Sequence, residues 1–136
     1  MTSLASPTSS RGRLWTGRVL STLAVAFLVF DAVIKVAKLA LAVEGTTQLG
    51  YPERAVAGIG IIELLCLAIY VIPRSAVLGA VLLTGYLGGA VATHVRVGSP
   101  LFSHILFPIY VGLMIWGGLY LRDERLRALF PLRRER

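Results

Sequence analysis

Apolar residues run in four long segments along the chain. Three charged side chains fall within residues 19–43, one within 55–73, and none within 75–95 or 97–121. A helix that crosses the hydrocarbon core of a bilayer needs about 20 mostly apolar residues. A water-soluble bundle would need a polar face on each helix, which the third and fourth segments lack. The pattern therefore predicts four membrane-spanning helices, over residues 19–43, 55–73, 75–96 and 100–121.

The short connections predict an all-α, antiparallel four-helix membrane bundle. Pro73 can end the second helix and Ser75 can cap the third, so these two helices should be neighbours. Ser99 as cap and Pro100 as first helical residue predict a similar turn before the fourth helix. Only the first connection, residues 44–51, is long enough to have a shape of its own. Pro108 lies inside the fourth segment and is expected to kink it.

The arginines predict how the bundle is oriented. The 136 residues, enough for one domain, carry a formal charge of +7, and most of the positive side chains flank the segments at one end. Ten arginines belong to that end, and two, Arg54 and Arg96, to the other; the ten are Arg11, Arg13, Arg18, Arg74, Arg122, Arg125, Arg127, Arg133, Arg134 and Arg136. Connections rich in Lys and Arg stay in the cytoplasm, so both termini should be cytoplasmic.

The same distribution argues against nucleic acid as a partner and defines two flanking regions. Residues 1–18 read as a disordered basic leader, and residues 122–136 as a basic cytoplasmic tail that can contact anionic headgroups. Cleavage of a signal peptide is disfavoured, because the first apolar segment is too long and contains an aspartate and two lysines.

Four charged residues lie inside the predicted spans, where each costs roughly 2.5–3.5 kcal/mol. Asp31, Lys35 and Lys38 fall within about 60° of one another on a helix with 100° per residue, so they share one face. Asp31 and Lys35 are i and i+4 neighbours that can pair directly. Glu63 belongs to the second span. All four should face the interior of the bundle.

Counting from the helix ends places Asp31, Glu63, Tyr86 and Tyr110 in one layer at the middle of the bundle. Lys35 lies about 6 Å and Lys38 about 10 Å further outward, by the helical rise of 1.5 Å per residue. The outer mouth holds a cluster of polar residues: His94, Arg96 and His104. The sequence therefore predicts a polar axis that runs from the middle of the bundle to its outer end.

The chemistry of this axis stays open between two interpretations. Two carboxyl groups face one nearby ammonium, so either Lys38 reaches inward or one carboxyl group is protonated. Such groups are typical of proton relays and of sites for polar ligands, and equally of salt bridges that fix helix register. At the outer mouth, His94 and His104 lack metal-ligand spacing, so no metal site is predicted. Two other interpretations suit the polar residues of the outer mouth better: side chains that extend to the membrane surface, or a site that binds an anionic group.

Five glycines in the third and fourth spans predict close helix packing, with a ligand groove as the alternative: Gly85, Gly88, Gly89, Gly117 and Gly118. Cys66 is the only cysteine, which excludes a disulfide within the chain and a paired-cysteine redox centre. No phosphate-binding loop or catalytic triad accompanies the serines. An autonomous enzyme is therefore not expected.

Several stretches resemble the DoxX-like family of small bacterial membrane proteins. They include residues 31–35, 49–52, 70–74, 82–90 and 93–104, together with Glu63 and residues 121–123 and 126–127, and the resemblance covers about residues 19–132. It implies a four-helix bundle in the bacterial cytoplasmic (inner) membrane. The founding member is a subunit of a thiosulfate:quinone oxidoreductase, so a quinone is the ligand that this resemblance suggests, by analogy of fold.

Three hypotheses follow for the function. The first is a bundle whose polar axis binds a small lipid-soluble ligand such as a quinone, with Tyr86 or His94 as hydrogen-bond donor, in support of a membrane redox process. The second is a non-catalytic scaffold or partner subunit of a membrane complex, using the glycine faces. The third is a proton-coupled transporter of a small solute, which with four spans would need a homodimer.

Overall fold

The computed structural model describes residues 7–130, and this part of the chain folds into helices without strands. The elements are α1 (Pro7–Val36), α2 (Ala40–Gln48), α3 (Glu53–Val71), α4 (Ala76–Arg96), a π-helical turn η1 (Leu101–Ile105), α5 (Phe107–Arg122) and α6 (Glu124–Leu129). Four stretches are long and apolar enough to cross a membrane: Arg11–Val36, Glu53–Val71, Ala76–Arg96 and Leu101–Arg122. The predicted all-α bundle of four spans is confirmed, and its environment is the lipid bilayer.

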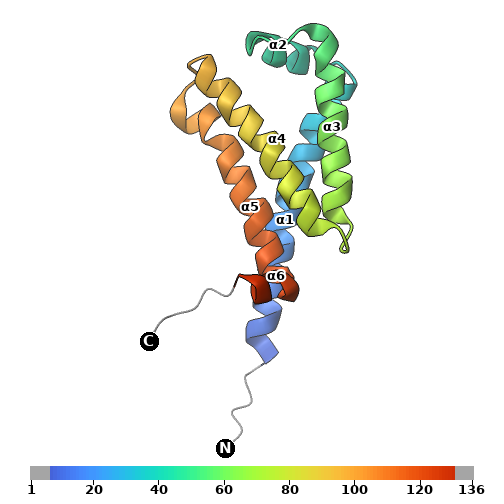
Figure 1. Ribbon diagram of the computed structural model, residues 1–136, viewed down its shortest axis with the longest axis vertical. Coiled ribbons are helices and arrows are strands. Elements are labelled where there is room, and N and C mark those ends of the chain that lie inside the picture. Colours follow the sequence, from blue (N-terminus) through green and yellow to red (C-terminus); the bar gives the residue numbers. More distant parts are fainter. Residues whose placement is uncertain (1–6, 131–136) are drawn as a thin grey trace, which may run out of the picture.

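The four long helices form a ring in which each packs against two neighbours (Figure 1). Helix α1 contacts α3 and α5, and α4 contacts the same two helices from the other side. Because the chain reverses direction between successive spans, these neighbours are antiparallel. Helix α2 lies at one end of the bundle, and α6 packs against α5 at the other end.

The first helix differs from its predicted bounds at both ends. It begins at Pro7, so residues 7–18, expected to be a disordered leader, are helical, while residues 1–6 lie outside the described part. It ends at Val36, because Lys38 adopts a left-handed backbone conformation with φ of 51°. The bond from Leu39 N to Ile34 O closes the helix in the manner of a Schellman motif. Residues 40–43, predicted to continue the span, belong instead to α2.

The first connection has a shape of its own, as predicted. Helix α2 ends at Gln48, and Gly50, with φ of 91°, reverses the chain in a conformation that only glycine adopts without strain. Pro52 then takes the extended N-cap position of α3. This arrangement brings one face of α2 over the end of the bundle.

The two tight turns form where predicted, although their serines act differently. Ser75 occupies the N-cap position of α4, but its hydroxyl donates to Ile69 O instead of capping the helix. Ser99 is not a cap, because its hydroxyl pairs with His94 Nδ1, 3.0 Å away. Pro100 takes the N-cap position of η1. The fourth span is interrupted at Leu106, where η1 gives way to α5 just before Pro108.

Close helix packing depends mostly on glycines that the sequence did not single out. A Cβ at Gly79 would overlap the backbone of Tyr70, and one at Gly17 would lie 2.8 Å from Gly118 O. Gly118 packs against α1 as predicted, and Gly117 lies near Leu20. Within the described chain, by contrast, the Cβ positions of three predicted packing residues have no neighbour within 4 Å: Gly85, Gly88 and Gly89. That packing assignment was wrong.

The basic tail after α5 begins with a short helix. The Asp123 carboxylate caps α6 by accepting from the backbone N–H groups of Arg125 and Leu126. Arg127 then donates to the last carbonyls of α5, those of Tyr120 and Leu121. These hydrogen bonds hold α6 against the C-terminal end of α5. Residues 131–136, with the remaining predicted tail arginines, lie outside the described part.

Candidate functional site

The Lys35 ammonium lies at the centre of the buried charges. Its three N–H groups point to three partners: Asp31 on the same helix, Glu63 Oε2 at 3.2 Å on α3, and the Tyr86 hydroxyl at 2.9 Å on α4. We call these four residues the Lys35 cluster. The predicted meeting of Asp31, Glu63 and Tyr86 at one depth is confirmed, and Lys35 joins them. An ammonium has three donors, and all three are used.

Glu63 is the most deeply buried member of the Lys35 cluster, with none of its surface exposed. Its Oε2 accepts hydrogen bonds from Lys35 and, at 2.8 Å, from the Tyr86 hydroxyl. Its Oε1 is also buried, and no group among residues 7–130 donates to it. Tyr86 thus accepts from Lys35 and donates to Glu63. Its hydroxyl proton is occupied, so the predicted role of Tyr86 as donor to a ligand is not available in this arrangement.

Two local features position the cluster. The spacing of Asp31 and Lys35 by one helical turn makes them neighbours on α1. Gly60, one turn before Glu63 on α3, lets α1 approach so closely that a Cβ there would lie 2.8 Å from Ala32 O and from Lys35 Cβ. The close crossing of α1 and α3 therefore carries Lys35 within reach of Glu63.

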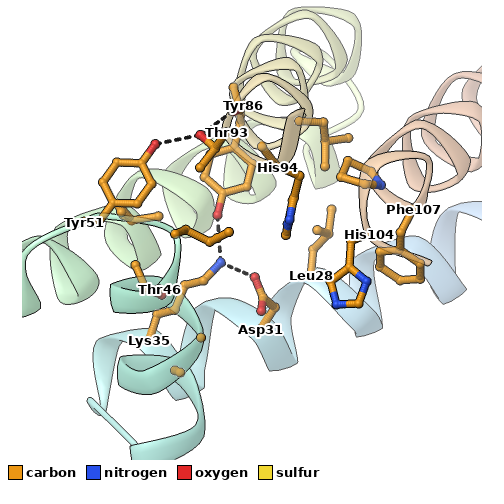
Figure 2. Close-up of a pocket in the computed structure, with 18 of the residues that line it drawn as sticks. Leu28, Asp31, Lys35, Thr46, Tyr51, Tyr86, Thr93, His94, His104 and Phe107 are labelled. Atoms are coloured by element: carbon orange, nitrogen blue, oxygen red, sulfur yellow. Dashed lines mark hydrogen bonds and ion pairs between the residues drawn. The ribbon is translucent and has the colours of Figure 1, made fainter. Parts of the chain in front are cut away.

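A cavity of about 880 Å³ opens above the Lys35 cluster, between the long helices and beneath α2. Its polar floor contains Asp31, Lys35 and Tyr86 (Figure 2). Glu63, which contacts both Lys35 and Tyr86, is not among the lining residues. Thr46 and the apolar face of α2 cover it, and aromatic side chains from α1 and α5 line its side. Two of these, Phe27 and Phe107, pack edge to face with ring centroids 5.0 Å apart. Gly85 and Gly89 line the cavity too, which agrees with the groove alternative for them.

The two histidines meet across the outer part of the cavity. The rings of His94 and His104 are 5.6 Å apart between centroids and 66° to one another. His94 Nδ1 pairs with Ser99, and His104 Nδ1 pairs with Ser103 Oγ at 2.7 Å. Because each Nδ1 has a serine partner, each ring keeps Nε2 for another contact. No group of three His, Cys, Asp or Glu within the described residues could hold a metal ion.

Two residues of the predicted polar axis lie outside this cavity. Lys38 is exposed at the outer end of α1, where its left-handed backbone conformation marks the end of the helix. It does not reach inward to balance the carboxylates. Arg96 donates to Leu49 O at 2.8 Å and lies against Gly50, so it holds the end of α2 in place. Tyr110, expected at the midplane, faces outward and is 44% exposed.

The sequence reasoning missed a second buried polar group at the opposite end of the bundle. Tyr70 is 1% exposed and donates to Ile115 O at 2.9 Å. Its oxygen also pairs with Ser21 Oγ at 2.9 Å, which in turn accepts from Arg122 Nε at 3.2 Å. The Arg122 guanidinium lies over the Tyr70 ring, 5.4 Å from its centroid. Tyr70 follows Glu63 by two helical turns, and that spacing places both on the inner face of α3.

Comparison with known proteins adds one finding to this geometry. The sequence model of the DoxX-like family matches residues 19–118. The chain belongs to the DoxX-like family. The matched region contains the whole Lys35 cluster and both histidines of this DoxX-like protein. No curated protein and no solved structure matches the chain significantly.

Proposed function

We propose that this DoxX-like protein binds a small lipid-soluble molecule in the cavity, in support of a membrane redox process. The observation that carries the proposal is a hollow of about 880 Å³ lined by membrane-spanning helices, with a few polar groups at one place in its wall. Ligand sites of proteins are typically apolar hollows of about 300–1,000 Å³ with a small number of polar groups that fix orientation. A ligand that dissolves in lipid can reach such a site from the bilayer.

A quinone is the candidate that the family resemblance suggests. The Nε2 atoms of His94 and His104 could donate to its carbonyl oxygens, provided that the serine hydroxyls donate to Nδ1. The aromatic side chains Phe27 and Phe107 supply a surface for a flat ring. The proposed role is that of a binding subunit that works with a redox partner or within a homo-oligomer.

The binding site can be tested by filling the cavity. Gly85 lines it, and nothing lies within 4 Å of its Cβ position, so Gly85→Phe should fold and place a phenyl group in the ligand's volume. Gly88→Phe is the matched control, because Gly88 is equally open but lies outside the cavity lining. In lipid nanodiscs, decylubiquinone or a short-chain menaquinone should raise the Tm of the native protein and of Gly88→Phe, and should leave Gly85→Phe unchanged. Equal shifts in all three would contradict the proposal.

We also propose that the end of the bundle with α6 faces the cytoplasm of a bacterial cell and that α2 faces outward. The support is the charge distribution: Arg18, Arg74 and Arg122 belong to the half of the bundle with α6, whereas Arg54 and Arg96 lie near α2. Alkaline phosphatase fused after residue 136 should therefore be inactive, and the same enzyme fused after Gly98 should be active. The reverse pattern would invert the orientation.

A further inference from the structure

We infer that the cavity also accepts a molecule with a protonated amine, and that the Asp31 carboxylate at the floor holds its ammonium group. This inference rests on the cavity being a ligand site, as proposed above, and adds a second chemical class of ligand, whose charged group lies at the floor and not between the two histidines. It is derived from the hydrogen bonds and the formal charges of the Lys35 cluster.

The hydrogen bonds are those of an ionised Glu63. Its Oε2 already accepts hydrogen bonds from Lys35 and Tyr86. A proton on Oε2 would therefore meet the hydrogen atoms of these two donors. Two donors directed at one carboxylate oxygen stabilise the charged form of the group.

The cluster then holds one more negative than positive charge. Asp31 and Glu63 contribute two carboxylates against the single ammonium of Lys35. The other nearby cations do not compensate, since Lys38 is exposed and Arg96 binds Leu49 O. The two histidines pair with Ser99 and Ser103 and form no hydrogen bond with the cluster. An unbalanced charge within a bilayer is costly, so a cationic ligand that reaches the floor gains the energy of neutralising it.

The open positions at the floor accept hydrogen bonds and do not donate them. Lys35 has used its three N–H groups, and the Tyr86 hydroxyl donates to Glu63. Asp31, by contrast, has a side chain that is 31% exposed and lines the cavity, and among the described residues it accepts a hydrogen bond from Lys35 alone. A carbonyl oxygen placed there would meet another acceptor. An ammonium group would donate to the carboxylate in a charge-assisted bond.

Aromatic faces in the cavity also suit a cation. Phe27, Phe30, Phe107, Tyr51 and Tyr86 all line it. Cations are attracted to aromatic faces within about 6 Å, and this attraction strengthens where water is excluded. The Lys35 ammonium already lies 5.6 Å from the centroid of the Tyr86 ring. The cavity thus offers a carboxylate for the charge of an amine and rings for its alkyl substituents.

The test compares two compounds of the same shape, phenylbutylamine and phenylbutanol, which differ in an ammonium and a hydroxyl group. Their affinities are measured by calorimetry with the native protein in nanodiscs of phosphatidylcholine. We expect the amine to bind about tenfold more tightly than the alcohol, and we expect Asp31→Asn to abolish this preference. Glu44→Gln is the control, because it removes a carboxylate of α2 outside the cavity lining and should keep the preference.

Three results would overturn the inference: equal affinity of the two compounds for the native protein, a preference that persists in Asp31→Asn, or no binding of either. The comparison on the native protein requires no variant, so it stands even if Asp31→Asn fails to fold. If both compounds bind equally and Gly85→Phe abolishes both, the cavity is a ligand site and only the amine assignment is wrong. If Gly85→Phe changes neither, the proposed function itself fails.

The natural amine could belong to a membrane lipid or to a free amphiphile, and a second set of nanodiscs separates these sources. Addition of phosphatidylethanolamine should weaken the binding of phenylbutylamine if the lipid headgroup occupies the site. It should leave the affinity unchanged if the natural ligand is a free amine. Both results support an ammonium site.

Discussion

Replacement of Lys35 by methionine is expected to lower the free energy of unfolding by about 3–5 kcal/mol, the usual cost of removing one partner from a buried ion pair. The reason is that Glu63, with no exposed surface, would keep its charge or take up a proton without any cation nearby. Tyr86 would remain as the single donor to its carboxylate. Unfolding in mixed micelles, followed by circular dichroism, measures the difference.

Lys38→Met is the matched control for this experiment. Lys38 lies three residues further along, is exposed, and forms no ion pair with the described residues, so its loss should change stability by less than about 0.5 kcal/mol. The double variant Lys35→Met with Glu63→Gln removes both buried charges and should recover more than half of the lost stability. If Lys35→Met is no less stable than Lys38→Met, the Lys35 cluster does not stabilise the fold.

Gly79→Val is expected to destabilise the bundle by about 3 kcal/mol or more, the upper range for overpacked interiors. A Cβ at Gly79 would overlap Tyr70 Cα and N, which are backbone atoms and cannot rotate away. Helices α3 and α4 would have to separate, and Tyr70 would lose its place between Ser21 and Ile115. Thermal unfolding, read from the fluorescence of the two tryptophans, reports the loss.

Gly88→Val is the control for the effect of valine itself, because nothing lies within 4 Å of the Cβ position of Gly88. It carries the same change of helix propensity on the same helix and should leave Tm nearly unchanged. Similar losses of stability in both variants would mean that helix propensity, and not the contact with Tyr70, sets the requirement for glycine.

The depth of the polar residues in the bundle could be predicted from the sequence, but the side of each helix that faces inward could not. Asp31 and Lys35 are one turn apart, and counting from the helix ends placed Glu63 and Tyr86 beside them. The same count also placed Tyr110 in this layer, although it faces outward. Depth follows from the lengths of the spans, whereas the face that turns inward depends on the neighbouring helices.

The glycine prediction failed because it used spacing between glycines alone. The buried residues of α4 include Ala76, Ala80, Leu83 and Leu87, spaced by three or four positions, and Gly79 belongs to the same face. Gly85 and Gly89 follow Leu83 and Leu87 by two residues, which is about 200° around the helix. The apolar periodicity of α4 would therefore have excluded them and selected Gly79. No pattern in the sequence indicated that α1 ends at Val36, because the helix ends through a positive φ at Lys38, a conformation that lysine rarely adopts.

The second buried polar group gives the bundle two unlike halves. The cavity occupies the half beneath α2, whereas the other half is filled by side chains with no more than 2% exposure, among them Leu67, Tyr70, Leu83 and Leu119. Arg122, joined to Ser21, closes that end. The cavity is therefore closed at the α6 end and does not continue through the bundle as a pore. A molecule that reaches Asp31 must depart the way it came, so passage across the membrane would first require Tyr70 to release both of its partners.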